Sequence, residues 1–77
     1  MARHAPDPPY GAALRRLRLA RDLTIEEAAR RGGVTANYLG DVERGQRNPT
    51  MRVVGRILVG LPSTWKEFAQ VLESLPQ

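Results

Sequence analysis

The sequence predicts an all-α domain made of five short helices, and three observations lead to this fold class. The chain has 77 residues and no cysteine, which allows one domain with a single thin core. Apolar side chains recur every three or four residues in several segments, as they do on one face of a helix. Threonine caps and glycine or proline stops divide these segments into helix-sized lengths.

The first two expected helices lie before the double glycine. Apolar and small residues recur at helical spacing from Tyr10 to Arg21, and arginines occupy positions between them. Thr24 and Glu27 then form a capping box, in which the hydroxyl accepts from a backbone NH and the carboxylate reaches back. This box opens a second, short helix that runs to Arg31.

Two glycines mark a tight turn before the third expected helix. One of Gly32 and Gly33 can adopt the left-handed conformation that ends a helix. Thr35 can cap a third helix that runs to Arg44. Its apolar residues point one way, and the opposite side carries polar or small residues. These are Ala36, Asn37, Gly40, Asp41 and Arg44.

Two more helices are expected after a polar loop. Thr50 can cap a helix that ends before Pro62. A second capping box, formed by Thr64 and Glu67, opens the last helix over residues 64–75. This last helix carries an apolar stripe. The stripe consists of Trp65, Phe68, Val71, Leu72 and Leu75.

Positive charge is concentrated in the first four fifths of the chain. Twelve basic and eight acidic side chains give a net charge of +4, and eleven of the basic residues precede residue 64. This distribution favours a polyanionic partner such as nucleic acid, although a general bias toward arginine would produce the same count. No apolar run approaches the roughly 18 residues that a membrane span needs, so we expect no membrane partner.

The sequence lacks the residue pattern of a catalytic or metal site. Its one histidine, His4, lies in a proline-rich segment, and its carboxylates are scattered. No spacing suits zinc or calcium, and no glycine pattern matches a phosphate-binding loop. We therefore expect a protein that is not an enzyme and needs no cofactor or metal. Residues 1–9 are expected to form a disordered arm in which Arg3 could reach DNA, and the absence of cysteine favours the cytoplasm.

The second and third expected helices suggest a helix-turn-helix. A turn of about three to four residues joins them at a steep angle, and the later helix presents a polar face. The major groove of DNA is about 12 Å wide and admits one helix. The residues therefore predict that the third helix can enter the major groove, although small helical bundles also contain such turns.

Several short motifs between residues 10 and 61 match a known family. They are Leu23-Thr24, Ala29, Gly33-Val34-Thr35, Val42-Glu43-Arg44-Gly45 and Asn48-Pro49-Thr50. Through them the segment resembles the Cro/repressor family, also called the xenobiotic-response-element family. The resemblance implies a lambda-repressor-like fold of five helices, with a DNA-binding domain over residues 10–62. The run Asn37-Tyr38-Leu39 and the aromatic last helix are similar to the controller proteins of restriction–modification systems.

The resemblance also implies which residues contact DNA. Base edges would be met by Ala36, Asn37, Tyr38 and Asp41. The DNA backbone would be met by Thr24, Thr35, Arg44, Arg47 and Asn48. Asn37 can pair with adenine through its amide, and Ala36 can touch a thymine methyl group. Arg18 and Glu43 would form a partly buried ion pair that orients the third helix.

A few positions depart from the family pattern. Ile25 stands where the family often has glutamine, Ala36 where controller proteins often have arginine, and Gly32 where an apolar residue is usual. Because these changes remove polar reading groups, the operator sequence stays open. Gly40 inside a helix is unfavourable by about 1 kcal/mol relative to alanine, which indicates either a close approach by DNA or a neighbouring helix, or no function at all.

Residues 63–77 are expected to form a dimerisation element. Such proteins bind two half-sites as two-fold dimers, because a single helix makes few contacts. The expected interface residues are Trp65, Phe68, Leu72 and Leu75, unless the last helix folds back onto its own core. The resulting hypothesis is a homodimeric transcriptional regulator on a palindromic operator, with restriction–modification genes as one target. The alternatives are a phage-type or housekeeping repressor, and a protein-binding module of the antitoxin or coactivator kind.

Overall fold

Five helices and no strands make up the part of the chain that the structure, a computed structural model, describes, residues 8–76. They are α1 (Tyr10–Ala20), α2 (Ile25–Gly32), α3 (Ala36–Glu43), α4 (Met51–Gly60) and α5 (Trp65–Ser74). The all-α fold class is therefore confirmed, with helix ends within two residues of those expected. No described helix has the length and apolar character needed to cross a membrane. The predictions for Arg3 and His4 lie outside the described residues.

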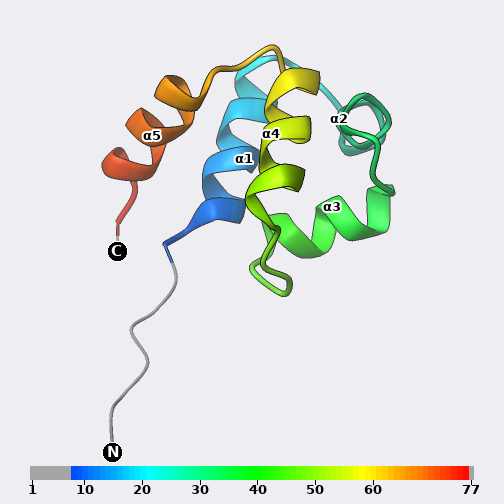
Figure 1. Cartoon of the computed structure of the whole chain (residues 1–77), viewed down its shortest axis with the longest axis horizontal. Helices are drawn as coiled ribbons and strands as arrows, with labels where there is room; N and C mark the ends of the chain where they lie inside the picture. Colours follow the sequence, from blue (N-terminus) through cyan, green and yellow to red (C-terminus); the bar gives the residue numbers. More distant parts are fainter. Residues whose placement is uncertain (1–7, 77) are drawn as a thin grey trace, which may run out of the picture.

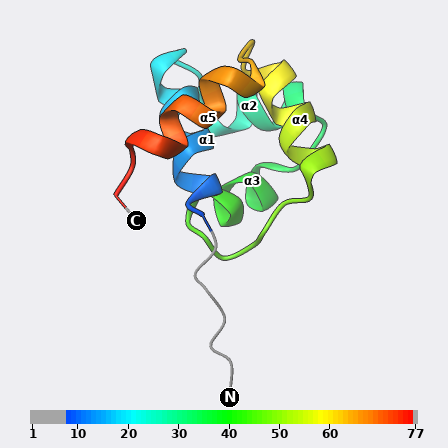
Figure 2. The same cartoon turned by 60° about the vertical axis from the view of Figure 1, so that its left-hand side comes forward.

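The helices form one bundle, in which α2 and α4 make the most extensive contact (Figure 1). α2 packs against α4 and α3, while α3 and α5 both pack against α1. Turning the molecule shows α5 lying along α1, with α3 at the other end of the bundle (Figure 2). As a result, α3 and α5 each have their own solvent-facing side.

Threonine caps start four of the helices, as the sequence predicts. The hydroxyl oxygens of Thr24, Thr35, Thr50 and Thr64 each accept a hydrogen bond from the backbone NH three residues later. At α2 and α5 the carboxylates of Glu27 and Glu67 also accept from the backbone NH of the capping threonine, which completes both capping boxes. These backbone hydrogen bonds hold the pKa of Glu27 and of Glu67 below the ordinary glutamate value, because they stabilise the ionised carboxylate.

The core is a single layer of small and aliphatic side chains, to which all five helices contribute. Phe68 of α5 is part of it, with only 4% of its surface exposed. Its ring stacks on Tyr10 of α1 and meets the edge of Trp65, with 6.1 Å between ring centroids in both pairs. The helix α5 therefore does fold back onto the core of its own chain through Phe68.

Two glycines allow the helices to approach closely. A Cβ atom at Gly11 in α1 would overlap the backbone carbonyl of Val42 in α3. A Cβ atom at Gly60 in α4 would lie 2.8 Å from the Cβ atom of Arg31 in α2. Since real Cβ atoms do not approach other atoms so closely, both helix pairs depend on the absence of a side chain.

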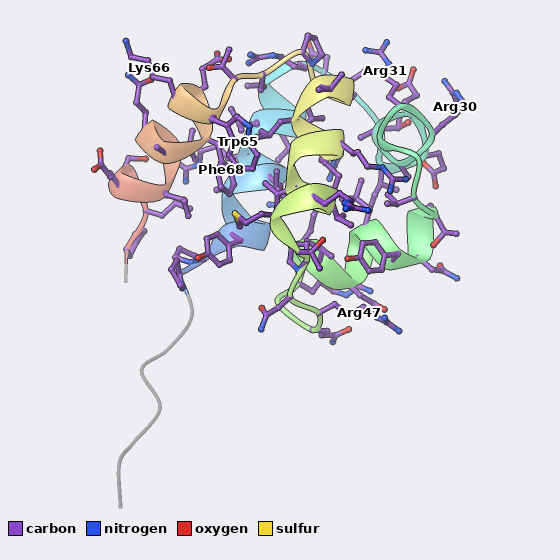
Figure 3. The ribbon with its side chains drawn as sticks, in the orientation of Figure 1. Arg30, Arg31, Arg47, Trp65, Lys66 and Phe68 are labelled. Carbon is purple, nitrogen blue, oxygen red and sulfur yellow. The ribbon has the colours of Figure 1, made fainter. Side chains whose placement is uncertain are left out.

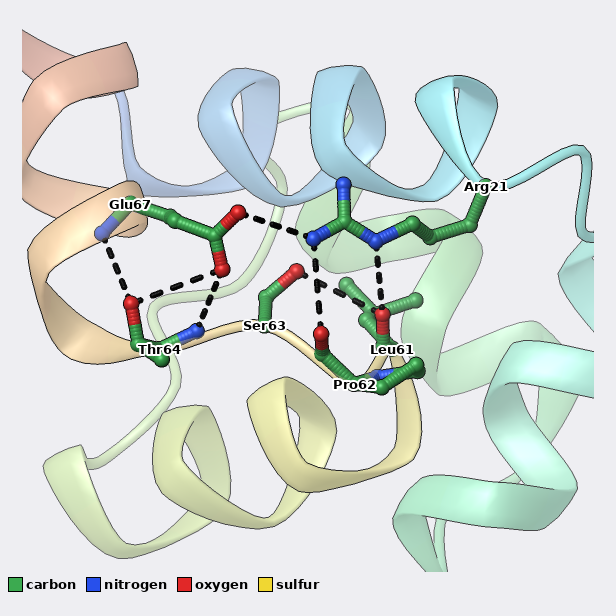
Figure 4. Close-up of polar contacts among 6 residues, drawn as sticks. All are labelled: Arg21, Leu61, Pro62, Ser63, Thr64 and Glu67. Carbon is green, nitrogen blue, oxygen red and sulfur yellow. Dashed lines mark hydrogen bonds and ion pairs between the residues drawn. The ribbon is translucent and has the colours of Figure 1, made fainter.

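Arg21, just after α1, fastens the start of α5 (Figure 4). Its Nε donates to the carbonyl oxygen of Leu61 at 3.1 Å, and its Nη2 donates to that of Pro62 at 3.3 Å. The same Nη2 forms an ion pair with Glu67 at 2.9 Å. One guanidinium therefore satisfies carbonyls at the end of α4 and holds the first turn of α5.

Candidate nucleic-acid interface

A tight turn joins α2 to α3. Gly33 has φ 71° and occupies the left-handed conformation at the end of α2. The next residue, Val34, donates its backbone NH to the carbonyl of Ala29 at 3.0 Å, which closes the end of α2. Thr35 then caps α3. The turn between the second and third helices is therefore as the sequence predicts, with Gly33 as the left-handed residue.

The helix α3 has a buried side and an exposed side. Leu39 and Val42 lie in the core. Asn37 is exposed, whereas Ala36 and Tyr38 are half-buried. The predicted base-contacting residues are thus at the surface of α3 to different degrees, and Asn37 is the most accessible.

Gly40 is buried beneath side chains at this surface. A Cβ atom here would lie 3.4 Å from Cδ1 of Ile25 in α2 and 3.0 Å from Nη1 of Arg44. The contact with Ile25 indicates that the close approach of a neighbouring helix accounts for the glycine at this position.

Arg18 and Glu43 form the predicted ion pair. Nε of Arg18 donates to Oε2 of Glu43 at 2.7 Å, and Nη2 donates to Oε1 at 3.0 Å. Nη1 of Arg18 donates to the carbonyl oxygen of Leu23 at 2.8 Å. The two side chains are 11% and 5% exposed, and the hydrogen bonds that Arg18 donates to Glu43 raise the pKa of Arg18. This pair therefore ties α1 to the end of α3.

A second cluster of charges lies on the outer side of α3. Oδ1 of Asp41 accepts from Nη2 of Arg44 at 2.7 Å, and Oδ2 lies 3.8 Å from Nε of Arg47. The guanidinium of Arg47 sits over the ring of Tyr38, 5.7 Å from its centroid. Arg47 extends from the loop that follows α3 (Figure 3). The structure thus brings together four of the predicted DNA-contacting residues, Tyr38, Asp41, Arg44 and Arg47.

The remaining predicted backbone-contacting residues are exposed at the ends of helices or in the loop. Thr24 lies at the start of α2 and Thr35 at the start of α3, where the positive ends of the helix dipoles favour anions. Asn48 lies in the loop between α3 and α4.

The residues expected at the dimer interface lie elsewhere, on α5 and the residue after it. Leu72 and Leu75 are half-buried against the core, and Trp65 is 49% exposed. Trp65 and Phe68 point toward the middle of the bundle, while Lys66 points away from it (Figure 3). Phe68 is therefore occupied within its own chain, and Trp65, Leu72 and Leu75 retain some surface.

Sequence reasoning missed how the charges on α3 are arranged. The spacing of Asp41 and Arg44, three residues apart on a helix, is a signal that could have revealed their pairing. No local pattern predicts that Arg47 turns back over Tyr38, because this depends on the path of the loop. In the described part of the chain, no three histidine or acidic side chains form a group that could hold a metal ion.

Comparison with known proteins now identifies the fold family. Residues 9–71 match the helix-turn-helix domain family. The chain belongs to this family. Over 66 residues it is 46% identical to the uncharacterized HTH-type transcriptional regulator y4dJ of Sinorhizobium fredii (strain NBRC 101917 / NGR234), and the match covers 86% of each protein.

Solved helix-turn-helix structures superpose well on the chain. The clp gene regulator ClgR of C. glutamicum has a TM-score of 0.83 at 24% identity, covering 91% of this chain and 94% of ClgR. The restriction–modification controller protein C.AhdI of Aeromonas hydrophila has a TM-score of 0.74 at 34% identity, covering 79% of this chain and 92% of C.AhdI. The controller protein C.Esp1396I, bound to a 25 base pair operator site, has a TM-score of 0.79 at 24% identity, covering 87% of this chain and 88% of C.Esp1396I. These matches confirm the resemblance to helix-turn-helix regulators that the sequence motifs indicate.

Proposed function

We propose that this protein is a sequence-specific DNA-binding transcriptional regulator, which acts in the cytoplasm as a homodimer on a palindromic operator. The observation that carries the proposal is the exposed side of α3 within a helix-turn-helix domain, where Asn37 lies one turn before Asp41 and the Arg44 and Arg47 guanidinium groups gather around Asp41. Its homologue y4dJ is named as a transcriptional regulator, which supports the same conclusion. The function is binding rather than catalysis, and it requires no cofactor.

Asn37 is the residue best placed to read sequence. Its amide is exposed near the start of α3, the part of a recognition helix that meets base edges. An asparagine amide can donate to and accept from one adenine, which discriminates that base by about 1–3 kcal/mol. Ala36 and Tyr38 lie beside it and complete the surface that would face the groove.

Asp41 is better suited to position arginines than to read a base. Its two carboxylate oxygens face Arg44 and Arg47, so a cytosine amino group would have to compete with two cations. Both guanidinium groups therefore lie close together near the end of α3, where they can bind phosphates of the DNA backbone. Thr24, Thr35 and Asn48 supply further contacts to the DNA backbone.

The dimer is assigned to the C-terminal half of α5. Leu72 and Leu75 are half-buried in the single chain, so a second copy could cover their remaining apolar surface. Phe68 contributes by fixing α5 to the core, and for this reason a charged residue at position 68 would test folding rather than dimerisation. Leu75→Glu should yield monomers in sedimentation, and Glu73→Gln, at an exposed neighbouring position, should leave the dimer intact.

Binding to genomic fragments selected by the protein itself tests the proposal. Affinity should fall steeply with salt, because each neutralised phosphate releases counterions. Asn37→Ala should weaken the selected fragment but not random DNA, whereas Arg47→Ala should weaken both alike. Equal effects of Asn37→Ala on both DNAs would reject its reading role. Failure to retain any DNA would favour the protein-binding alternative.

A further inference from the structure

An open surface groove with a volume of about 540 Å³ lies between α2, α4 and the start of α5, in a different place from the exposed side of α3. We call it the Arg–Trp groove. Its main lining residues are Arg31, Arg52, Gly55, Arg56, Val59 and Trp65. The proposed DNA contacts use none of these side chains.

The floor of the groove is apolar. Gly55 has no side chain, and a Cβ atom there would lie 3.2 Å from the indole of Trp65, so the ring rests on α4. Val59 is 79% exposed and Trp65 is 49% exposed. An apolar body placed against them would cover surface that the single chain leaves in water.

The rim of the groove is cationic. Arg31 donates to the carbonyl of Gly60 at 3.4 Å, and Arg56 donates to the carbonyl of Gly33 at 2.9 Å. No ion pair within residues 8–76 involves Arg31, Arg52 or Arg56. No carboxylate lines the cavity. Three guanidinium groups therefore surround an apolar floor with no carboxylate in the lining, and the charge of Arg31 also acts on Glu27 outside it.

We propose that the Arg–Trp groove binds a small organic anion with an aromatic body, of the aromatic carboxylate or sulfonate class. The volume lies within the range of about 300–1,000 Å³ typical of small-molecule sites. An aromatic ring can stack on the Trp65 indole, and the guanidinium groups can bind the acidic group through charge-assisted hydrogen bonds. The combination of both features in one cavity favours an amphipathic anion over an inorganic one.

A second copy of the chain fits this groove poorly. Two-fold pairing through it would bring two sets of three arginines together without carboxylates between them, and like charges at an interface are unfavourable. A small anion has the opposite effect, because it supplies the missing negative charge.

The groove has a direct link to the helix-turn-helix. The Gly33 carbonyl that accepts from Arg56 belongs to the left-handed residue between α2 and α3. An anion that draws Arg56 to itself removes this donor from the turn. Occupation of the groove should therefore change the backbone environment of Gly33 and Val34, just before α3 begins.

The probe for the test is 1-anilinonaphthalene-8-sulfonate, an aromatic sulfonate whose fluorescence rises in apolar sites. Trp65 is the one tryptophan of the chain and lies in the groove, so energy transfer from it reports the bound probe. We expect saturable binding at one site, and roughly tenfold weaker binding by the uncharged analogue N-phenyl-1-naphthylamine, because it cannot accept from the arginines. NMR spectra of the backbone amides should show chemical-shift changes at Gly33 and Val34 when the probe binds.

Paired arginine variants separate this site from general attraction to a basic protein. Arg52→Ala/Arg56→Ala should weaken the sulfonate about tenfold. Arg15→Ala/Arg16→Ala also removes two positive charges, but from a different pocket, which Arg15 and Arg16 line together with Leu19. This control should leave the affinity for the sulfonate unchanged. Circular dichroism establishes that both variants are folded.

Three outcomes would overturn the proposal. Equal weakening by both arginine pairs would mean attraction by net charge, and equal binding of the neutral analogue would mean an apolar patch only. A decrease in acrylamide quenching of Trp65 fluorescence as the protein concentration rises would mean that a second copy covers the groove. No DNA enters these measurements, so their result is independent of the proposed regulatory function.

Discussion

An arginine–carboxylate ion pair lies on each side of α3, and the two pairs differ in how exposed they are. On the inner side the Arg18 and Glu43 side chains are largely buried and joined by two hydrogen bonds between helices. On the outer side Asp41 pairs with Arg44 in its own helix, and the arginine is largely exposed. Burial decides the role of each pair, because a buried charge that loses its partner is far more costly than an exposed one. The inner pair therefore holds two helices together, and we propose that the outer pair exchanges partners with DNA.

The largest expected effect comes from filling the inner contact between α1 and α3. Gly11→Ala places a methyl group on the Val42 carbonyl, so one of the two helices must move. We expect a loss of about 3 kcal/mol in the free energy of unfolding, at the upper end for overpacking. Denaturant unfolding measures it. Gly45→Ala is the control, since it has open space but a φ of 78°, and it should lose only about 1 kcal/mol. Similar losses in both variants would contradict the tight packing.

Removing the inner carboxylate should have the next largest effect. Glu43→Gln leaves the guanidinium of Arg18 without its anion in a largely buried position, which should cost about 2–3 kcal/mol of unfolding free energy. The double variant Arg18→Met/Glu43→Leu removes both charges, and it should recover part of this loss. A double-mutant cycle with no coupling between positions 18 and 43 would show that the pair does not act as a unit.

The same change on the outer side should affect DNA binding instead. Asp41→Asn releases two largely exposed arginines, so the free energy of unfolding should change by less than about 1 kcal/mol. Affinity for random DNA should rise, because a negative charge leaves the surface that we propose faces phosphates. Parallel unfolding and DNA titrations check this pair of results. A loss of stability as large as that of Glu43→Gln would erase the distinction between the two sides.

The smallest expected effect concerns the capping box at the start of α2, beside the outer surface. The folded-state pKa of Glu27 is lowered, so its contribution is present above the unfolded pKa and is lost as pH falls through the folded pKa. The melting temperature should therefore decrease as the pH is lowered below about 4.5. In Glu27→Gln this part of the fall should be missing, while Glu26→Gln, on the exposed neighbour, should retain it. Identical pH profiles for all three proteins would argue against the box.

The parts of the fold that the sequence predicts are those that depend on residues close together in the chain. The threonine caps and both capping boxes depend on residues three apart, so the sequence shows them directly. The pairing of Arg18 with Glu43 was available only through the family resemblance, because 25 residues separate the partners.

The features that could not be predicted depend on how distant segments meet. Helical periodicity places Phe68 on an apolar stripe, but it does not say whether the stripe faces the core or a second chain. The close approach at Gly11, the three contacts of Arg21 and the Arg–Trp groove each join separate helices or loops. The spacing of residues along the chain does not predict such contacts between distant segments.

The orientation of α3 on DNA tests the central claim most directly. Because the chain has no cysteine, Gln46→Cys and Ala69→Cys each create one attachment point for an iron chelate that cuts nearby DNA. Position 46 lies in the loop after α3, and position 69 lies on the exposed side of α5. The account predicts cuts within the selected fragment from the chelate at position 46 and none from the one at position 69. Cuts from position 69 without cuts from position 46 would show that a different surface meets the DNA.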